Sequence, residues 1–318
     1  MENKVIPVTI ITGFLGSGKT TLLNNLLRRY SQLKILIIEN EVGEINIDRD
    51  IISKGKNANV YELTNGCICC SLNKELGTVL NSIILSKTDY DYLLIEATGI
   101  ADPGEIIQMF NGERVQRYFR LDGVITLADG HLINDQLPQH FEVRSQINHA
   151  NHILVNKTDL VDKNKLQEIT DTLKSINPFA KINLCSFCNT DHIELLNLHA
   201  YHPDTIEKSI INFNSLYFAK SHELQSASLT LNGDFQMEDI SEWLETYLQS
   251  HTKNILRIKG VLSIKGMKHK IILQSVANDF QIYQGDEWTQ EEIRISRLVF
   301  IGKKIDEEQI QEELGNLC

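Results

Sequence analysis

The sequence lacks the features that mark several classes of protein. No apolar run approaches the length of a membrane span, so we expect no transmembrane helix. Basic residues number 31 against 42 acidic ones, and the formal net charge of -11 argues against a nucleic-acid partner. The N-terminus has no signal-peptide pattern, and six cysteines in 318 residues do not resemble a secreted disulfide framework. We therefore predict a cytoplasmic protein with reduced thiols and without a membrane partner.

The first two thirds of the chain alternate short apolar runs with longer amphipathic stretches. The apolar runs that predict strands cover residues 5–11, 33–38, 92–95, 124–127, 153–155 and 182–184. Strand–helix alternation of this kind predicts an α/β fold, a mainly parallel sheet with helices on both faces. We place this domain at residues 1–200 and a linker at 201–221.

A different pattern follows the linker and predicts a smaller C-terminal α+β domain at residues 222–318. Its expected strands cover residues 223–231, 255–264, 270–276 and 298–301. An amphipathic helix is expected at 237–249, and a closing helix begins after Asp306, a typical N-cap residue.

A phosphate-loop pattern lies between the first predicted strand and the first predicted helix. The residues expected to contact a nucleotide there are Gly13, Gly16, Ser17, Gly18, Lys19, Thr20 and Thr21. Glycines allow successive backbone N–H groups to point at a phosphate, and the helix N-terminus adds a favourable dipole. Lys19 should neutralise β- and γ-phosphate oxygens, and the Thr20 hydroxyl should bind Mg²⁺. These residues predict a P-loop NTPase.

Two later strand ends complete the predicted nucleotide site. Glu96 ends one buried strand and can hold Mg²⁺ directly or through water, while Gly99 can place its N–H against a γ-phosphate. Asn156-Lys157-Thr-Asp159 ends another strand, and the Asp159 carboxylate can accept both N–H donors of guanine, a pair that adenine lacks. We therefore predict GTP and GDP as ligands, and Lys19, Thr20, Glu96 and Gly99 as the catalytic residues.

Three cysteines, Cys67, Cys69 and Cys70, lie within four residues of one another after an Asn-Gly turn signal. Neighbouring Cα atoms are only about 3.8 Å apart, too close for an unstrained disulfide between the last two. Thiolates suit Zn²⁺, and also Co²⁺ or Cu⁺, far better than Mg²⁺ or Ca²⁺. Glu39 and Glu44, in an acidic segment, could join the thiolates on the metal, reach Mg²⁺ or orient the attacking water, and the alternative for them is a solvated acidic loop. The alternatives are small buried hydrophobes or a redox-sensing thiol group.

Other cysteines and histidines are weaker candidates. Cys185 and Cys188 have two-residue spacing but no second ligand pair, so we expect no metal there. His199 and His202 lie near the polar linker, where we expect solvated side chains. Ile100 follows Gly99 where many GTPases carry a glutamine that orients water, so we expect slow intrinsic hydrolysis.

Taken together, these motifs resemble the CobW-like family of GTPase metallochaperones, which includes zinc chaperones and is related to the GTPases that insert nickel into urease and hydrogenase. The matching segments occur in the family's order and are GFLGSGKTT, ENEVGE, CICC, EATGIADP and NKTD. The segments Arg257-Ile-Lys-Gly260 and Leu298-Val-Phe-Ile-Gly302 resemble the family's C-terminal domain more loosely. The resemblance implies Mg²⁺-dependent GTP hydrolysis, a transition metal on the cysteine motif, and transfer to a client metalloprotein. The chain lacks the histidine-rich tract of some members.

The resulting hypothesis is a GTP-hydrolysing metallochaperone whose zinc, or cobalt, is held at the cysteine motif under nucleotide control. The alternative is a regulatory GTPase with a thiol redox-sensing cluster. A phosphate-loop kinase is a third reading, although the N-K-x-D pattern has no role in ATP binding. The client protein and the oligomeric state stay open.

Overall fold

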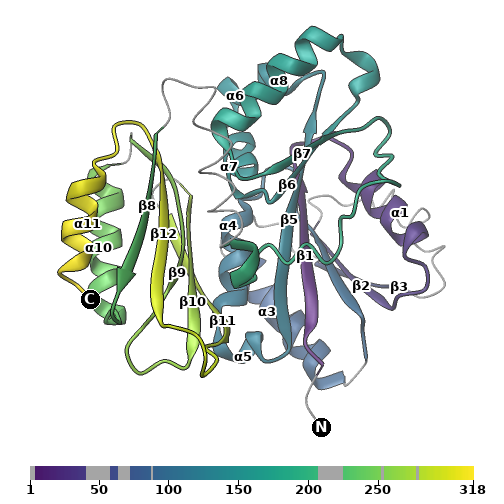
Figure 1. Cartoon of the computed structure of the whole chain (residues 1–318). Helices are drawn as coiled ribbons and strands as arrows, with labels where there is room; N and C mark the ends of the chain where they lie inside the picture. The colour runs from purple at the N-terminus through teal and green to yellow at the C-terminus, as the bar shows by residue number, and fades with distance from the viewer. Residues whose placement is uncertain are drawn as a thin grey trace. The chain divides into compact units, whose positions relative to one another are not determined.

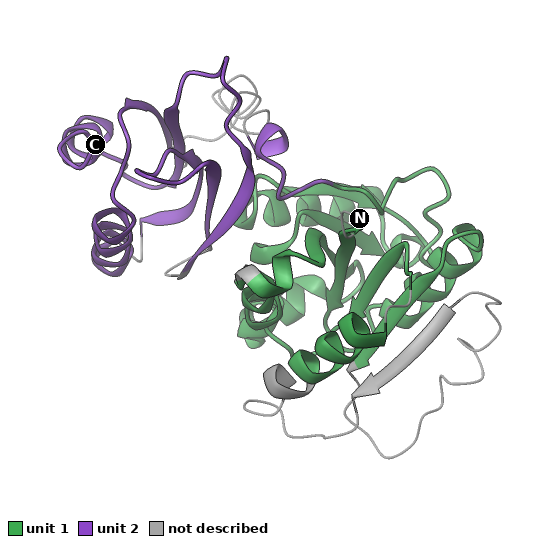
Figure 2. Ribbon diagram, turned by 90° about the horizontal axis from the view of Figure 1, so that it is seen from below, with its two compact units in different colours: residues 1–198 green, residues 199–318 purple. Residues whose placement is uncertain are grey.

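The computed structural model describes residues 4–40, 58–63, 72–86, 89–206, 225–251, 254–276 and 279–318. The chain divides into two units, residues 1–198 and 199–318, which are described separately (Figure 2). Most of the predicted linker, residues 201–221, lies outside the described residues. No helix in the described ranges is long and apolar enough to cross a membrane.

The first unit is built on a seven-stranded sheet with the order β3-β2-β4-β1-β5-β6-β7, in which all neighbouring strands are parallel. Its strands are β1 (Ile6–Gly13), β2 (Ile35–Asn40), β3 (Ala58–Leu63), β4 (Tyr92–Glu96), β5 (Phe119–Asp129), β6 (His152–Asn156) and β7 (Lys181–Leu184). Its helices are α1 (Lys19–Arg29), α3 (Leu72–Ser86), α4 (Pro103–Gln108), α5 (Glu113–Gln116), α6 (Ile133–Gln139), α7 (Phe141–His149) and α8 (Lys163–Ile176), with short 3₁₀ turns η1 (Met109–Asn111) and η2 (Thr158–Leu160).

Helices cover both faces of this sheet (Figure 1). Strand residues alternate between two apolar cores, so Leu154 of β6 packs in the core of α1, whereas Ile153 and Val155 pack in the core of α6, α7 and α8. All five β6 residues are buried, as expected for a parallel strand covered on both sides. This arrangement confirms the predicted α/β fold.

Helix α1 illustrates why the segment after the phosphate loop is helical. Leu22, Leu23, Leu26 and Leu27 recur at helical spacing and are all buried. Arg28 and Arg29 lie in the last turn, where a positive charge opposes the negative end of the helix dipole. The buried leucines hold α1 against the sheet, which positions its N-terminus at the phosphate loop.

The second unit contains a five-stranded antiparallel sheet with the order β11-β10-β9-β12-β8. Its elements are β8 (Gln225–Asn232), α10 (Met237–Ser250), β9 (Ile255–Leu262), β10 (His269–Val276), β11 (Asp279–Glu287), β12 (Ile295–Gly302) and α11 (Glu307–Gly315). Both helices pack on the same core as one face of the sheet. Asp306 caps α11 and accepts the Gln309 N–H at 3.0 Å, as predicted. The unit confirms the predicted α+β class.

Two strands that the sequence did not predict lie at sheet edges. β3 is an edge strand of the sheet in the first unit, and β11 is an edge strand of the sheet in the second unit. β11 carries many polar residues, and Asn59 and Glu62 interrupt the apolar residues of β3. An edge strand has only one neighbouring strand and needs no continuous apolar run.

Candidate nucleotide-binding site

Three loops leave the same edge of the parallel sheet. β1 ends at Gly13, β4 ends at Glu96 and β6 ends at Asn156. The strand order reverses around β1, because β4 lies on one side of it and β5 on the other. Ligands of open α/β sheets bind at the carboxyl edge near such a reversal. The fold therefore gathers the phosphate loop, Glu96 and the Asn156–Asp159 segment, which lie far apart in the sequence.

The glycines of the phosphate loop are required by its backbone and its close packing. Gly13, Gly16 and Gly18 have φ angles of 144°, 74° and 108°, which L-residues with side chains rarely adopt. A Cβ on Gly13 would lie 2.4 Å from the Leu127 carbonyl oxygen, and one on Gly18 would lie 2.7 Å from Asn156 Nδ2. A Cβ on Gly16 would meet nothing within 4 Å, so Gly16 borders open space where a phosphate can approach the backbone.

The N-terminus of α1 is suited to an anion. Gly18 caps the helix without a side-chain hydrogen bond, and the first turn contains no acidic residue. Lys19 Nζ donates to the carbonyl oxygens of Gly13 at 2.9 Å and Phe14 at 3.3 Å, which holds the ammonium group over the loop. The buried Ser17 Oγ has no hydrogen-bond partner among the described residues. A bound phosphate would supply the missing acceptor.

Thr20 and Glu96 come together from α1 and β4. The half-buried Thr20 hydroxyl donates to Glu96 Oε1 at 3.0 Å. A hydroxyl and a carboxylate beside a phosphate loop are the hard oxygen ligands that Mg²⁺ takes together with water and phosphate oxygens. These residues fit a magnesium ion. The neighbouring Thr21 is exposed.

Asn156 connects the end of β6 and the segment after β7 to the phosphate loop. It is buried, its Nδ2 donates to the Ser17 carbonyl oxygen at 3.0 Å, and its Oδ1 accepts the Cys188 N–H at 3.0 Å. The Lys157 backbone has a left-handed φ of 60°, and its Nζ pairs with Asp129 Oδ2 at 2.6 Å. Asp159 is exposed at the same loop, where its carboxylate can meet a base.

The segment after β7, residues 185–188, belongs to this site and was not predicted as part of it. Ser186 Oγ accepts the Asp159 N–H at 3.2 Å, and Cys188 Sγ donates to the Gly18 carbonyl oxygen at 3.3 Å. Burial raises the pKa of the Cys185 thiol to about 11 and that of Cys188 to about 12, so both are packed as neutral thiols. The sequence signal that could have found them is their position at the carboxyl end of another parallel strand.

Gly99 lies against the phosphate loop. A Cβ on Gly99 would lie 2.5 Å from Leu15 Cδ2 and 2.8 Å from the Leu15 backbone nitrogen. Gln146, from α7, donates its Nε2 hydrogens to the Gly99 carbonyl oxygen at 3.0 Å and to that of Ala101 at 3.3 Å. Nothing in the sequence marked Gln146, because it lies 47 residues from Gly99 and belongs to no motif.

The predicted transition-metal ligands are placed only in part. Cys67, Cys69, Cys70 and Glu44 lie outside the described residues. Glu39 is near the end of β2, in register with Glu96 of β4. Within the described ranges, no group of three or more His, Cys, Asp or Glu side chains is placed to hold a metal ion.

The two linker histidines are not simply solvated, as the sequence suggested. His202 is half-buried, and its Nε2 lies 2.7 Å from Asp286 Oδ2 of β11. The His199 and His202 rings have centroids 6.4 Å apart in an edge-on arrangement. Because His202 already has an acidic partner, the expectation of a solvated pair was wrong for this residue.

Comparisons with known proteins agree with both units. Residues 7–183 match the nucleotide-binding domain described as CobW/HypB/UreG, and residues 224–318 match the cobalamin synthesis protein cobW C-terminal domain. The zinc chaperone YjiA of Escherichia coli is 33% identical, with 98% of each chain covered. The zinc chaperone CobW of Pseudomonas aeruginosa is 28% identical and covers 97% of this chain and 90% of its own.

A solved structure extends this similarity to three dimensions. The crystal structure of the Zn(II)-bound YjiA GTPase from E. coli has a TM-score of 0.60 to this chain, at 28% identity and with 99% of each chain covered. Both the sequence and the structural similarity therefore run through the two units.

Proposed function

Because the chain belongs to the CobW/HypB/UreG family, we propose that it binds zinc at Cys67, Cys69 and Cys70 and transfers it to a client protein under the control of bound GTP. Membership of this family, together with relatives named as zinc chaperones and as a GTPase, supports a GTPase metallochaperone in general terms. Our proposal adds three points to this general function: zinc binding at the three cysteines, transfer to a client protein, and control of the transfer by the bound nucleotide.

The observation that carries this proposal is the register of three neighbouring strands. Glu39 of β2 pairs with Glu96 of β4 on one side and with Glu62 of β3 on the other. β3 ends at Leu63, and Cys67 follows four residues later, within roughly 14 Å of extended chain. The peptide that carries the thiols therefore leaves the sheet edge two strands away from Glu96, the proposed magnesium ligand.

The nucleotide site supports GTP hydrolysis by positioning and charge. Lys19 and the N-terminus of α1 would hold the phosphates, and Thr20 and Glu96 would hold Mg²⁺, which when bound neutralises charge on the phosphate oxygens. The exposed Asp159 carboxylate would accept the two donors of guanine. Ile100 offers no polar group to orient water, so we propose a slow intrinsic rate.

Coupling between metal and nucleotide follows from linkage. The γ-phosphate would contact the Gly99 region and the segment that follows Glu39, and hydrolysis would remove those contacts. If GTP favours the state in which the thiolates bind zinc tightly, zinc must favour GTP by the same factor. Loss of the γ-phosphate would then lower the affinity for zinc and release it to a docked client.

Metal analysis of the reduced, GTP-loaded protein tests the proposal. We expect about one equivalent of zinc in the wild type and at least a tenfold weaker affinity in Cys69→Ser, because one thiolate ligand is lost. Cys318→Ser is the matched control, since Cys318 is an exposed thiol at the C-terminus. Equal zinc binding by the wild type and by Cys69→Ser would contradict the cysteine site.

A further inference from the structure

We propose that Gln146 is a positioning residue for GTP hydrolysis, which fixes the Gly99 loop (residues 97–102, between β4 and α4) against the phosphate loop. This inference rests on the proposed hydrolysis of GTP at this site. It assigns a role to a residue that lies outside all the nucleotide-binding motifs of the chain.

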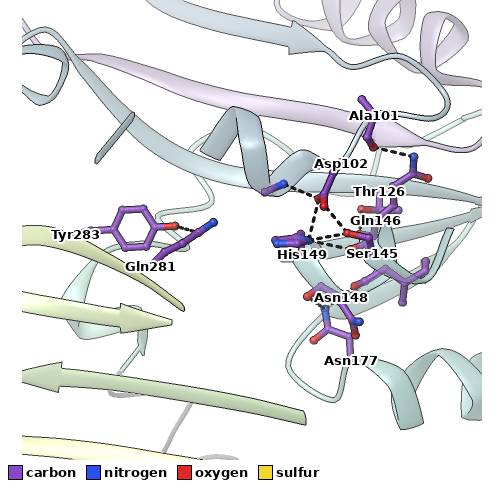
Figure 3. Close-up of polar contacts among 12 residues, drawn as sticks. Ala101, Asp102, Thr126, Ser145, Gln146, Asn148, His149, Asn177, Gln281 and Tyr283 are labelled. Atoms are coloured by element: carbon purple, nitrogen blue, oxygen red, sulfur yellow. Dashed lines mark hydrogen bonds and ion pairs between the residues drawn. The ribbon is translucent and has the colours of Figure 1, made fainter. Parts of the chain in front are cut away.

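The contacts of Gln146 are directed at the backbone of the Gly99 loop (Figure 3). Its side-chain amide donates to the Gly99 carbonyl oxygen at 3.0 Å and to the Ala101 carbonyl oxygen at 3.3 Å. Gln146 is only 1% exposed, so these bonds are shielded from competing water. One amide group thus fixes the orientation of two peptide units in a short loop.

Helix α7, which carries Gln146, is itself held firmly. The Thr126 hydroxyl of β5 donates to the Gln146 carbonyl oxygen at 2.8 Å. The Asn177 side chain donates to three carbonyl oxygens at the end of α7, those of Ile147 at 2.7 Å, Asn148 at 3.1 Å and Ala150 at 2.8 Å. The sheet and the end of α8 therefore fix the helix from which Gln146 reaches the loop.

A second contact from α7 holds the end of the Gly99 loop (Figure 3). Ser145 Oγ donates to Asp102 Oδ1 at 2.9 Å, and the same carboxylate oxygen accepts the Gly104 N–H at 2.9 Å and caps α4. His149 Nδ1 lies 3.8 Å from Asp102 Oδ1. The start of the loop is tied to β1, because the Ala97 N–H donates to the Ile11 carbonyl oxygen at 2.9 Å.

These contacts hold the Gly99 loop in a position in which Gly99 packs against Leu15 of the phosphate loop. The space beside Gly99 is filled by Leu15, whose backbone nitrogen would lie 2.8 Å from an added Cβ. In a bound GTP, the γ-phosphate would be the part of the nucleotide nearest to Gly99. Gln146 should therefore affect steps that involve the γ-phosphate and leave the binding of GDP unchanged.

Gln146→Met tests this role, because it keeps the length of the side chain and removes both donors. We expect kcat for GTP to fall about tenfold, as two buried hydrogen bonds are lost, while the affinity for GDP stays within about twofold. Gln167→Met is the matched control, since Gln167 is exposed on α8 and its amide donates to Asp171, its sole hydrogen-bond partner in the described part of the chain. A general loss of folding would lower the GDP affinity as well.

Gln146→Glu adds a signature that a structural role would not produce. A buried carboxyl facing two carbonyl oxygens should have a raised pKa, and only its protonated form can donate, through its single O–H, to one of them. The kcat of this variant should therefore recover relative to wild type as the pH is lowered from about 8 to about 6, whereas that of Gln146→Met should not.

The outcomes separate this inference from the proposed function. A wild type without GTP hydrolysis would contradict the proposed function and this role together. A wild type that hydrolyses GTP while Gln146→Met has the same kcat would overturn the role of Gln146 alone. Should both Gln146 variants fail to fold, Ser145→Ala, at a half-buried position of the same helix, tests instead whether contacts from α7 position the loop for hydrolysis. A lower kcat with unchanged GDP affinity would support the role, and an unchanged kcat would overturn it.

Discussion

The two ends of the nucleotide site are held in different ways. On the base side, Asn156 bridges the phosphate loop and the segment after β7, and α1 adds hydrogen bonds from Asn25 to the Cys188 carbonyl oxygen and from Arg29 to those of Thr190 and Ile193. On the γ-phosphate side, the Gly99 loop is held mainly by Ser145 and Gln146 of one helix, α7.

This difference suggests that the two sides of the site have different functions. The proposed base side ties α1, the phosphate loop and β6 together, so we propose that it recognises the guanosine that GTP and GDP share. The Gly99 loop has contacts of its own to α7, separate from those of the Asn156 side, so we propose that it is the segment that responds to a γ-phosphate. Changes on the base side should weaken both nucleotides alike, and changes near Gly99 should affect GTP alone.

The largest effect is expected for Asn156→Ala. The substitution leaves the Ser17 carbonyl oxygen and the Cys188 N–H without their buried partner, which costs about 2 to 3 kcal/mol. The affinities for GTP and GDP should fall together by roughly 30- to 150-fold in a fluorescent-nucleotide titration. The control is Asn164→Ala, an exposed position on α8. A loss of affinity for GTP alone would contradict the proposed role of Asn156 in binding both nucleotides.

A smaller and selective effect is expected for Gly99→Ala. The new methyl group would collide with Leu15 at 2.5 to 2.8 Å and displace the Gly99 loop from the phosphate loop. We expect the rate of GTP hydrolysis to fall roughly tenfold to thirtyfold, with GDP affinity almost unchanged. Gly112→Ala is the matched control, because its Cβ would meet nothing within 4 Å. Equal losses for GTP and GDP would show that Gly99 is part of the shared framework.

The smallest effect is expected for Cys188→Ala. It removes one weak thiol hydrogen bond to the Gly18 carbonyl oxygen and a little buried volume, while the backbone N–H still donates to Asn156. Both nucleotides should bind about threefold more weakly, measured in the same titration. Cys318→Ala provides the control at an exposed thiol. A change in the ratio of GTP to GDP affinity would place Cys188 with the γ-phosphate side instead.

The sequence predicted the elements that carry a strong local signal. Apolar runs marked the buried strands, and the phosphate loop lies where its pattern placed it, between β1 and α1. β3 and β11 were missed because edge strands can remain polar. Gln146 and Ser186 were missed because their part in the site depends on tertiary packing: one projects from a helix 47 residues beyond Gly99, and the other follows the last parallel strand.

The most direct test of the account is a zinc titration of the reduced protein with either a non-hydrolysable GTP analogue or GDP bound. If the γ-phosphate controls the cysteine site, the protein should bind zinc at least fivefold more tightly with the GTP analogue than with GDP. This ratio corresponds to a coupling free energy of about 1 kcal/mol. Equal zinc affinities in the two nucleotide states would contradict nucleotide-controlled metal transfer.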